Sequence, residues 1–94
     1  MKEARSSRHE LIKQEIGKRL REYRMSNNLN FRQLFIKNKY LHPGRTPKLE
    51  RGELNAFLDF YLDLCAVYGI TLSDLFAGVE EVVDQILADE NENK

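Results

Sequence analysis

Residues 55–69 decide the fold, and their sequence is Asn55-Ala-Phe-Leu-Asp-Phe-Tyr-Leu-Asp-Leu-Cys-Ala-Val-Tyr-Gly69. Asparagine is a favoured residue at the N-cap of a helix, and glycine is favoured just after a helix end. No proline or glycine interrupts the mainly apolar residues between them. The stretch therefore predicts a helix that is capped by Asn55 and ends at Gly69.

A long helix is predicted near the start of the chain. Ser6 or Ser7 is its expected N-cap, and Asn27 or Asn28 its expected end, because asparagine tolerates the left-handed conformation that closes a helix. Its apolar residues recur every three or four positions and so share one helical face; they are Ile12, Ile16, Leu20 and Tyr23.

A very short helix is predicted directly before the deciding stretch. Pro43-Gly44 predicts a turn, and Pro47 fits the first position of a helix that is capped by Thr46. This helix would run to Arg51 and stop at Gly52.

Three further helices complete an all-α prediction, because no segment has the alternating pattern of a strand. Asn30 and Gln33 have the spacing of a capping box and begin one helix. Thr71 or Ser73 begins another. The last helix carries the stripe of an amphipathic helix, formed by Val79, Val82, Val83, Ile86 and Leu87.

Composition favours one small domain. The chain has 94 residues, of which 41% are hydrophobic, enough for one modest core and no second domain. A single cysteine excludes an internal disulfide. The first ten residues lack the apolar stretch of a signal peptide, and no apolar run approaches the roughly 20 residues of a membrane span. We therefore expect a cytoplasmic protein that does not bind a membrane.

The sequence lacks the usual features of an enzyme. Cys65 lies among apolar residues, and the distant His9 and His42 do not have the spacing of zinc ligands. There is no glycine-rich phosphate loop and no Ser-His-Asp arrangement. We predict a non-enzyme without metal, cofactor or small-molecule substrate.

The two parts of the chain differ strongly in charge. Residues 1–53 contain fourteen basic and six acidic residues, whereas residues 54–94 contain one basic and nine acidic residues. Such asymmetry favours a surface that binds a polyanion. Alternatively, these are ordinary solvated helix surfaces, and the segregation is lost on folding.

Four segments together have the pattern of a known family. They are Ile16–Arg24, Asn28-Leu29-Asn30, Leu49-Glu50-Arg51-Gly52 and Gly69-Ile-Thr-Leu-Ser-Asp-Leu-Phe76. In combination they resemble the Xre/Cro family of lambda-repressor-like helix-turn-helix domains, over about residues 12–76. The resemblance implies five helices, of which the second and third form the DNA-binding unit, and a dimer that places each third helix in a major groove of double-stranded DNA.

The sequence departs from this family in the third helix. Pro43, Gly44 and Pro47 interrupt a segment that is continuous helix in the family, and a proline inside a helix costs about 3 kcal/mol. Thr46 stands where the family usually has an apolar core residue, and Phe31 where it often has a phosphate-binding glutamine. Either the third helix is short and the preceding loop contacts DNA, or base recognition has been lost.

We predict DNA-binding side chains around the second and third helices. They are Arg32, Gln33, His42, Arg45, Thr46, Lys48 and Arg51. For Arg51, a structural pairing in the Glu-Arg-Gly motif is favoured at least as much as a DNA contact, and for Lys37 and Lys39 ordinary surface exposure is favoured. Lys2, Arg5 and Arg8 form either a minor-groove arm or a disordered terminus.

A homodimer is predicted from excess apolar surface. Phe57 and Phe60 stand where family members usually have polar residues, so the fourth helix is apolar nearly all round. The predicted interface consists of Phe57, Phe60, Val79, Val82, Val83 and Ile86. The alternative is that the last helix folds back over the fourth helix of the same chain.

These patterns lead to two hypotheses of function. The first is a sequence-specific transcriptional regulator that occupies an operator as a dimer, favoured by the basic first half. The second is a protein-interaction module on the same scaffold, such as an antirepressor or antitoxin-like partner, favoured by the two prolines. In both, we expect a flexible basic arm at residues 1–10, the helix-turn-helix domain at 11–77, an amphipathic helix at 78–89 and a disordered tail at 90–94.

Overall fold

Six helices and no strand make up residues 2–92, the part of the chain that the computed structural model describes; side chains are described for residues 7–91. The helices are α1 (Lys2–Ser26), α2 (Phe31–Lys37), α3 (Thr46–Glu50), α4 (Leu58–Tyr68), α5 (Leu72–Phe76) and α6 (Val79–Glu92). The all-α prediction is confirmed.

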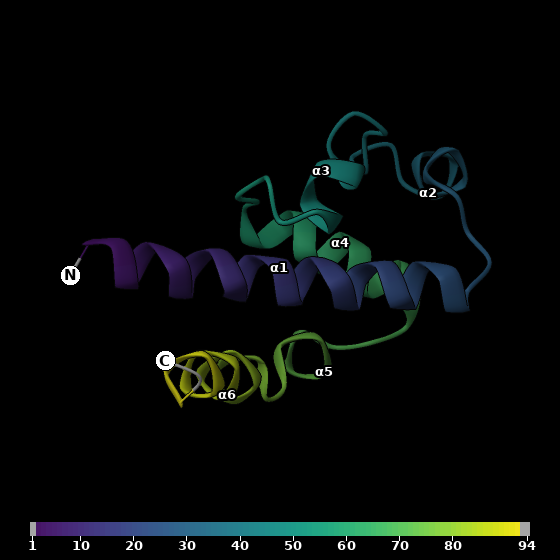
Figure 1. Ribbon diagram of the computed structural model, residues 1–94. Helices are drawn as coiled ribbons and strands as arrows, with labels where there is room; N and C mark the ends of the chain where they lie inside the picture. Colours follow the sequence, from purple (N-terminus) through teal and green to yellow (C-terminus); the bar gives the residue numbers. More distant parts are fainter. Residues whose placement is uncertain (1, 93–94) are drawn as a thin grey trace.

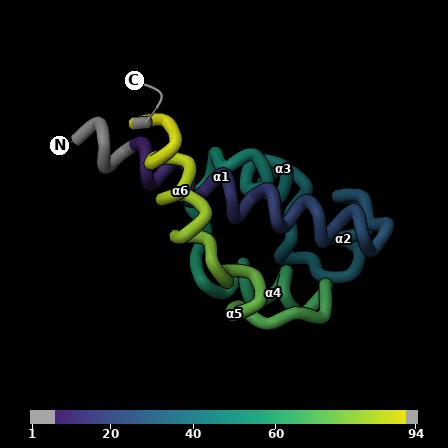
Figure 2. Tube along the Cα trace, turned by 60° about the horizontal axis from the view of Figure 1, so that its bottom comes forward, coloured from purple at the N-terminus to yellow at the C-terminus, as the bar shows by residue number. Residues whose placement is uncertain are grey.

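The long helix α1 is the axis on which the other helices are arranged. It packs against α3, α4, α5 and α6. Figure 1 shows α2 and α3 on one side of α1, with α5 and α6 on the other. Figure 2 shows α6 crossing the N-terminal half of α1. The two helices expected to bind DNA are thus separated from the last helix by the full width of α1.

The core is formed by residues from each of the helices α1, α2, α3, α4 and α5 and from the loop between α2 and α3. Its buried members are Leu20, Leu34, Leu41, Leu49, Phe60, Leu64, Cys65, Tyr68 and Leu75. Burial raises the pKa of the Cys65 thiol. Val79 and Val83 are also buried but lie outside this cluster, where α6 packs on α1.

None of the described helices is by itself long and apolar enough to cross a membrane. The pair Leu58–Tyr68 and Leu72–Asn91 has the required length and composition, but the two parts meet at a bend of 102°.

Several predicted helix ends are confirmed. Asn30 and Gln33 form the expected capping box, in which each side chain hydrogen-bonds the backbone N–H of the other residue. Thr71, not Ser73, caps α5. Asn28 and Gly69 have φ angles of 55° and 69°, the left-handed conformation that ends α1 and α4.

Other predicted boundaries are wrong. Helix α4 begins after Phe57, not Asn55, because Leu54 and Ala56 pack on the core and residues 53–57 connect α3 to α4 without helical structure. Arg45 is the N-cap residue of α3 and makes no side-chain capping bond, and Thr46 is the first residue of the helix.

The predicted flexible arm and tail are largely helical. Residues 2–10 continue α1, and Arg8 forms ion pairs with Glu80 and Asp84 that hold this end against α6. The predicted tail at 90–94 is helical as far as Glu92, and residues 93–94 lie outside the described part. Of the expected arm, Met1 and the side chains of Lys2 and Arg5 also lie outside it.

A close approach at Gly17 sets the distance between α1 and α3. A Cβ atom at this position would lie 2.6 Å from the carbonyl oxygen of Leu49 and closer still to that of Glu50. Only a residue without a side chain lets the two backbones meet in this way.

We expect Gly17→Ala to destabilise the protein. Alanine should add about 1 kcal/mol of intrinsic helix stability, but the clash with backbone atoms forces α1 and α3 apart, at a net cost of about 2 kcal/mol. Urea denaturation of Gly17→Ala and of Lys18→Ala, its exposed neighbour, provides the comparison. Equal stability of the two variants would contradict the close packing described here.

Candidate nucleic-acid interface

Basic residues dominate the segment from the second half of α1 through α3. Residues 18–48 contain nine basic residues and one acidic residue, Glu22. Within the described residues, seven of the nine have no carboxylate within ion-pair distance. They are Lys18, Arg21, Arg32, Lys37, Lys39, Arg45 and Lys48. Unpaired cations are available to an external anion.

The other basic residues whose side chains the structure describes are paired within the chain. The pairs are Arg8 with Glu80 and Asp84, Lys13 with Glu10, Arg19 with Glu15, Arg24 with Glu50 and Arg51 with Glu53. The hydrogen bonds from Arg8 lower the pKa of the Asp84 carboxyl. The acidic helix α6 therefore neutralises only the N-terminal end of α1 and leaves residues 18–48 unaffected.

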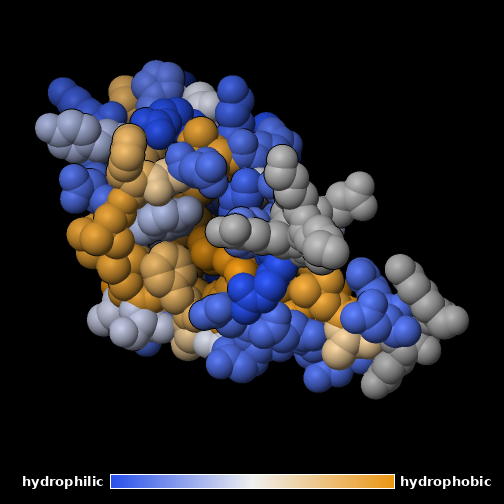
Figure 3. All heavy atoms as spheres, turned by 90° about the vertical axis from the view of Figure 1, so that its left-hand side faces the viewer, coloured by the Kyte–Doolittle hydropathy of each residue, from blue (hydrophilic) through white to orange (hydrophobic). Residues whose placement is uncertain are grey.

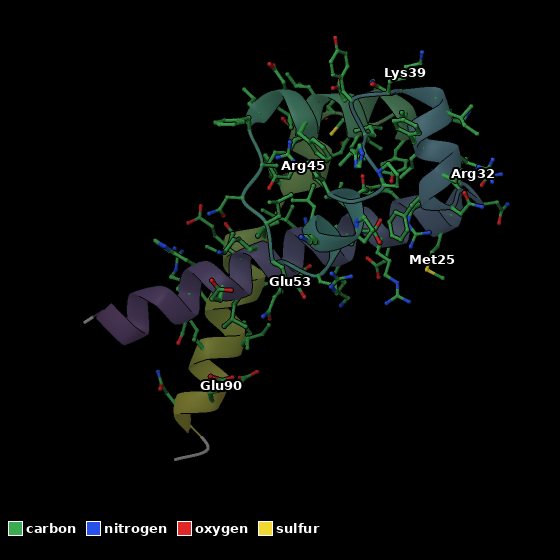
Figure 4. All side chains as sticks on the ribbon, turned by 90° about the horizontal axis from the view of Figure 1, so that it is seen from above. Met25, Arg32, Lys39, Arg45, Glu53 and Glu90 are labelled. Atoms are coloured by element: carbon green, nitrogen blue, oxygen red, sulfur yellow. The ribbon has the colours of Figure 1, made fainter. Side chains whose placement is uncertain are left out.

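The unpaired cations and the acidic last helix lie at different ends of the molecule. In Figure 4, Arg32, Lys39 and Arg45 lie around α2, the loop and α3, whereas Glu90 lies far from them on α6. Figure 1 shows the same separation across α1. The cations of residues 18–48 thus lie apart from the acidic α6, whereas Asp59 and Asp63 of α4 line a cleft together with Arg45.

The connection between α2 and α3 is longer than a standard helix-turn-helix turn. Eight residues, 38–45, join the two helices, against the three or four of the common motif. The predicted turn at Pro43-Gly44 is present, and the carbonyl of His42 accepts hydrogen bonds from the backbone N–H groups of Arg45 and Thr46. Helix α3 has five residues, with Pro47 in its first turn, as the prolines predict.

Five predicted DNA-binding residues lie exposed on this side. Arg32 lies at the start of α2, Lys48 on α3, and His42 and Arg45 in the connection between these helices. His42 already accepts a hydrogen bond at Nδ1 from the N–H of Gly44, at 2.9 Å. Gln33 is exposed too, but its Oε1 is occupied in the capping box.

Thr46 and Arg51 have structural roles, whereas Arg45 is exposed and has no ion pair among the described residues. Thr46 is only 1% exposed and donates its hydroxyl hydrogen bond to the carbonyl of His42, so its prediction as a DNA contact is wrong. Arg51 pairs with Glu53, the structural alternative. The Arg45 guanidinium lies over the Phe60 ring, 5.3 Å from its centroid.

The predicted dimer interface is not one surface. Phe60, Val79 and Val83 are buried within the chain, the first in the core and the other two where α6 packs on α1, so their prediction as interface residues is wrong. Phe57 is 83% exposed, and Val82 and Ile86 are partly exposed on α6. The alternative is also corrected: α6 folds back mainly on α1, not on α4.

Sequence analysis missed Lys18 and Arg21 as candidate contacts. Both are exposed on α1, and Arg21 lines a cleft of about 240 Å³ with Pro47 of α3 and Arg51. The sequence pattern places Lys18 and Arg21 off the apolar face of α1. It does not predict that α3 approaches Arg21.

The ion pair of Arg24 and Glu50 holds the site together. Arg24 donates two hydrogen bonds to Glu50, at 2.7 and 3.1 Å, and a third to the carbonyl of Leu29. Its guanidinium also lies 4.1 Å from the ring centroid of Phe31, the first residue of α2. The hydrogen bonds to Glu50 raise the pKa of Arg24. This side chain thus connects α1, α2 and α3.

One buried polar atom near this ion pair has no partner. The Tyr68 hydroxyl is enclosed in the core without a hydrogen bond, and burial raises its pKa. Within the described residues, no group of three or more His, Cys, Asp or Glu side chains could hold a metal ion.

No known family model, curated protein or solved structure matches the chain.

We expect Glu50→Gln to destabilise the fold, because it leaves the largely buried Arg24 without a counter-charge. The cost should be about 2 kcal/mol, below that of a fully buried pair since Arg24 keeps some contact with water. Glu53→Gln removes the exposed partner of Arg51 and should leave urea denaturation close to wild type. If both variants unfold alike, the ion pair does not hold α3 on α1.

Proposed function

We propose that the chain binds double-stranded DNA through the face formed by α2, the 38–45 loop, α3 and the second half of α1. The observation that carries this proposal is the set of seven unpaired cations between Lys18 and Lys48, on the opposite side of α1 from the acidic α6. Binding to DNA phosphates releases condensed counterions, which supplies a large part of the affinity.

In this proposal, contacts with DNA phosphates supply most of the binding free energy. Helix α3 has five residues, which span about 7 Å along its axis, against a major groove about 12 Å wide. Of its side chains Lys48 is exposed, whereas Thr46 and Leu49 are buried. Base contacts would come from Lys48 and from loop residues such as His42.

The proposed biological role is that of a transcriptional regulator. In this proposal, the helices form a DNA-binding domain of the lambda-repressor-like helix-turn-helix type. Support comes from the family-like segments of the sequence and from the order of α1 to α5, with α2 and α3 adjacent on one side of α1. The eight-residue α2–α3 connection and the short α3 favour recognition by the loop over a standard recognition helix.

A salt titration tests the proposal. Binding to a mixed-sequence duplex, measured by fluorescence anisotropy between about 20 and 200 mM salt, should weaken linearly on a log–log plot. Arg32→Ala/Lys39→Ala/Lys48→Ala should reduce the slope by roughly 2.7, at about 0.9 for each phosphate that the variant no longer neutralises. Each substitution is at an exposed position, so the fold should be retained.

Single variants provide the matched control. Lys48→Ala should weaken binding, whereas Lys13→Ala, which removes a cation that is paired with Glu10, should not. No binding by the wild type at the lowest salt, or equal slopes for the wild type and the triple variant, would exclude the proposal.

A further inference from the structure

A cleft with aromatic walls lies where α4 begins, beside the 38–45 loop. Phe57 is 83% exposed, and Tyr40 in the loop is 79% exposed. We call this site, with a volume of about 250 Å³, the aromatic cleft; the residues that line it are Tyr40, Arg45, Phe57, Asp59, Phe60 and Asp63. Figure 3 shows apolar atoms gathered on the side of the molecule that carries α4.

The backbone around Tyr40 holds this side chain out in solvent. The N–H of Tyr40 donates a hydrogen bond to Oδ1 of Asn38 at 2.9 Å, and the N–H of Leu41 donates one to the carbonyl of Asn38 at 3.0 Å. The side chain of Leu41 is fully buried in the core. A ligand at Tyr40 therefore meets an aromatic side chain on backbone that is already ordered, which lowers the entropy cost of binding.

The aromatic cleft also carries charges of both signs. The Arg45 guanidinium lies 5.3 Å from the centroid of the Phe60 ring. Asp59 and Asp63 lie one helical turn apart on α4. Within the described residues, none of these three charged groups forms an ion pair. The cleft thus offers aromatic rings for stacking, one cation and two carboxylates that accept hydrogen bonds.

We propose that the aromatic cleft takes one unpaired base of the bound DNA, which stacks on Tyr40 and Phe57. The inference rests on the proposed function, because Tyr40 and Arg45 belong to the loop that contacts DNA there. Proteins bind unstacked bases with this combination of groups: aromatic side chains or arginine against the ring, and polar groups on the edge of the base. The 38–45 loop then recognises a local opening of the duplex as well as its phosphates.

The charges determine which part of a nucleotide enters the cleft. Asp59 and Asp63 repel a phosphate, but they accept hydrogen bonds from the N–H groups of a base. Guanine has two neighbouring donors, its ring N–H and its amino group, whereas thymine has one N–H between two carbonyl oxygens. The phosphates stay outside, near Lys39 and Arg45, which have no ion pair within the described residues. We therefore expect an unpaired guanine to bind more tightly than an unpaired thymine.

The size of the cleft favours a base that arrives as part of DNA. Its volume of about 250 Å³ lies below the roughly 300–1,000 Å³ of sites for drug-sized ligands. So small and open a site gives a free nucleotide little affinity. Once the cations between Lys18 and Lys48 hold the duplex, the base is present at a high effective concentration.

Three duplexes of one sequence test the inference by fluorescence anisotropy. The first is fully paired, the second has one extra unpaired guanine, and the third has an abasic residue in place of that guanine. The abasic duplex keeps the interruption of the helix but has no base to stack. The wild type should bind the guanine duplex about tenfold more tightly than the abasic one, the order expected for one stacked base. A duplex with an unpaired thymine should lie between the two.

Variants of the ring residues show where the base binds. Tyr40→Ala should make the affinities for the guanine and abasic duplexes nearly equal, whereas Tyr40→Phe keeps the ring and should keep the difference. Phe57→Ser should reduce the difference without loss of stability, because Phe57 is the N-cap of α4 without a side-chain capping bond, and serine is among the best N-cap residues. The matched control is Ile36→Ser, an exposed apolar position on α2 that does not line the cleft, which should leave the difference unchanged.

Asp59→Ala/Asp63→Ala tests the contacts with the edge of the base. The loss of two negative charges should tighten binding to every duplex, so the ratio of two affinities of the same variant is compared. The preference for guanine over thymine should disappear, while the preference for thymine over the abasic residue should remain. An unchanged preference for guanine would contradict the role of the carboxylates.

The inference is overturned if the wild type binds the guanine and abasic duplexes alike, if Tyr40→Ala keeps the difference, or if Ile36→Ser loses it. It is also overturned if free deoxyguanosine monophosphate competes as well as the guanine duplex does. Equal binding of the paired, guanine and abasic duplexes leaves the proposed function standing. No binding of any duplex at the lowest salt excludes both.

Discussion

The packing of α3 on α1 determines where the basic side chains lie. A helix of five residues has too few internal hydrogen bonds to be stable alone, so α3 depends on its neighbours. Two contacts supply this support: the backbone of its last residues lies against Gly17, and Glu50 pairs with Arg24. The same arginine contacts the start of α2 through Leu29 and Phe31. The positions of Arg32 and Lys48 therefore depend more on the contacts that Gly17 and Arg24 of α1 make with α3 and α2 than on the sequence next to them.

Most acidic residues after residue 53 lie on α6 or α4, with different consequences. On α6, Glu80 and Asp84 pair with Arg8, far from the α2–α3 side, and leave the cations there unpaired. On α4, Asp59 and Asp63 border an exposed apolar groove beside Arg45. A net charge of zero thus conceals a segment of unpaired cations, within residues 18–48, that lies apart from the acidic α6.

Local signals predicted the fold well, and long-range contacts account for the errors. The capping box at Asn30, the left-handed ends at Asn28 and Gly69 and the short α3 all follow from side chains acting on nearby backbone. The start of α4 does not, because Leu54 and Ala56 pack on the core and keep Asn55 out of the helix. Arg8 looked like part of a free arm because its partners lie more than seventy residues away. Similarly, Thr46 is polar but buried, which its hydrogen bond to the His42 carbonyl permits. Of the apolar stripe of α6, Val79 and Val83 are buried where α6 packs on α1.

The burial of Cys65 has a practical consequence. It is the only cysteine of the chain, it lies in the core beside Leu64, and its thiol resists ionisation there. A thiol reagent attacks the thiolate, so modification must wait until the hydrophobic interior opens to solvent. The rate of labelling then measures how often α4 separates from its neighbours, with no engineered probe and no second reactive position to confuse the signal.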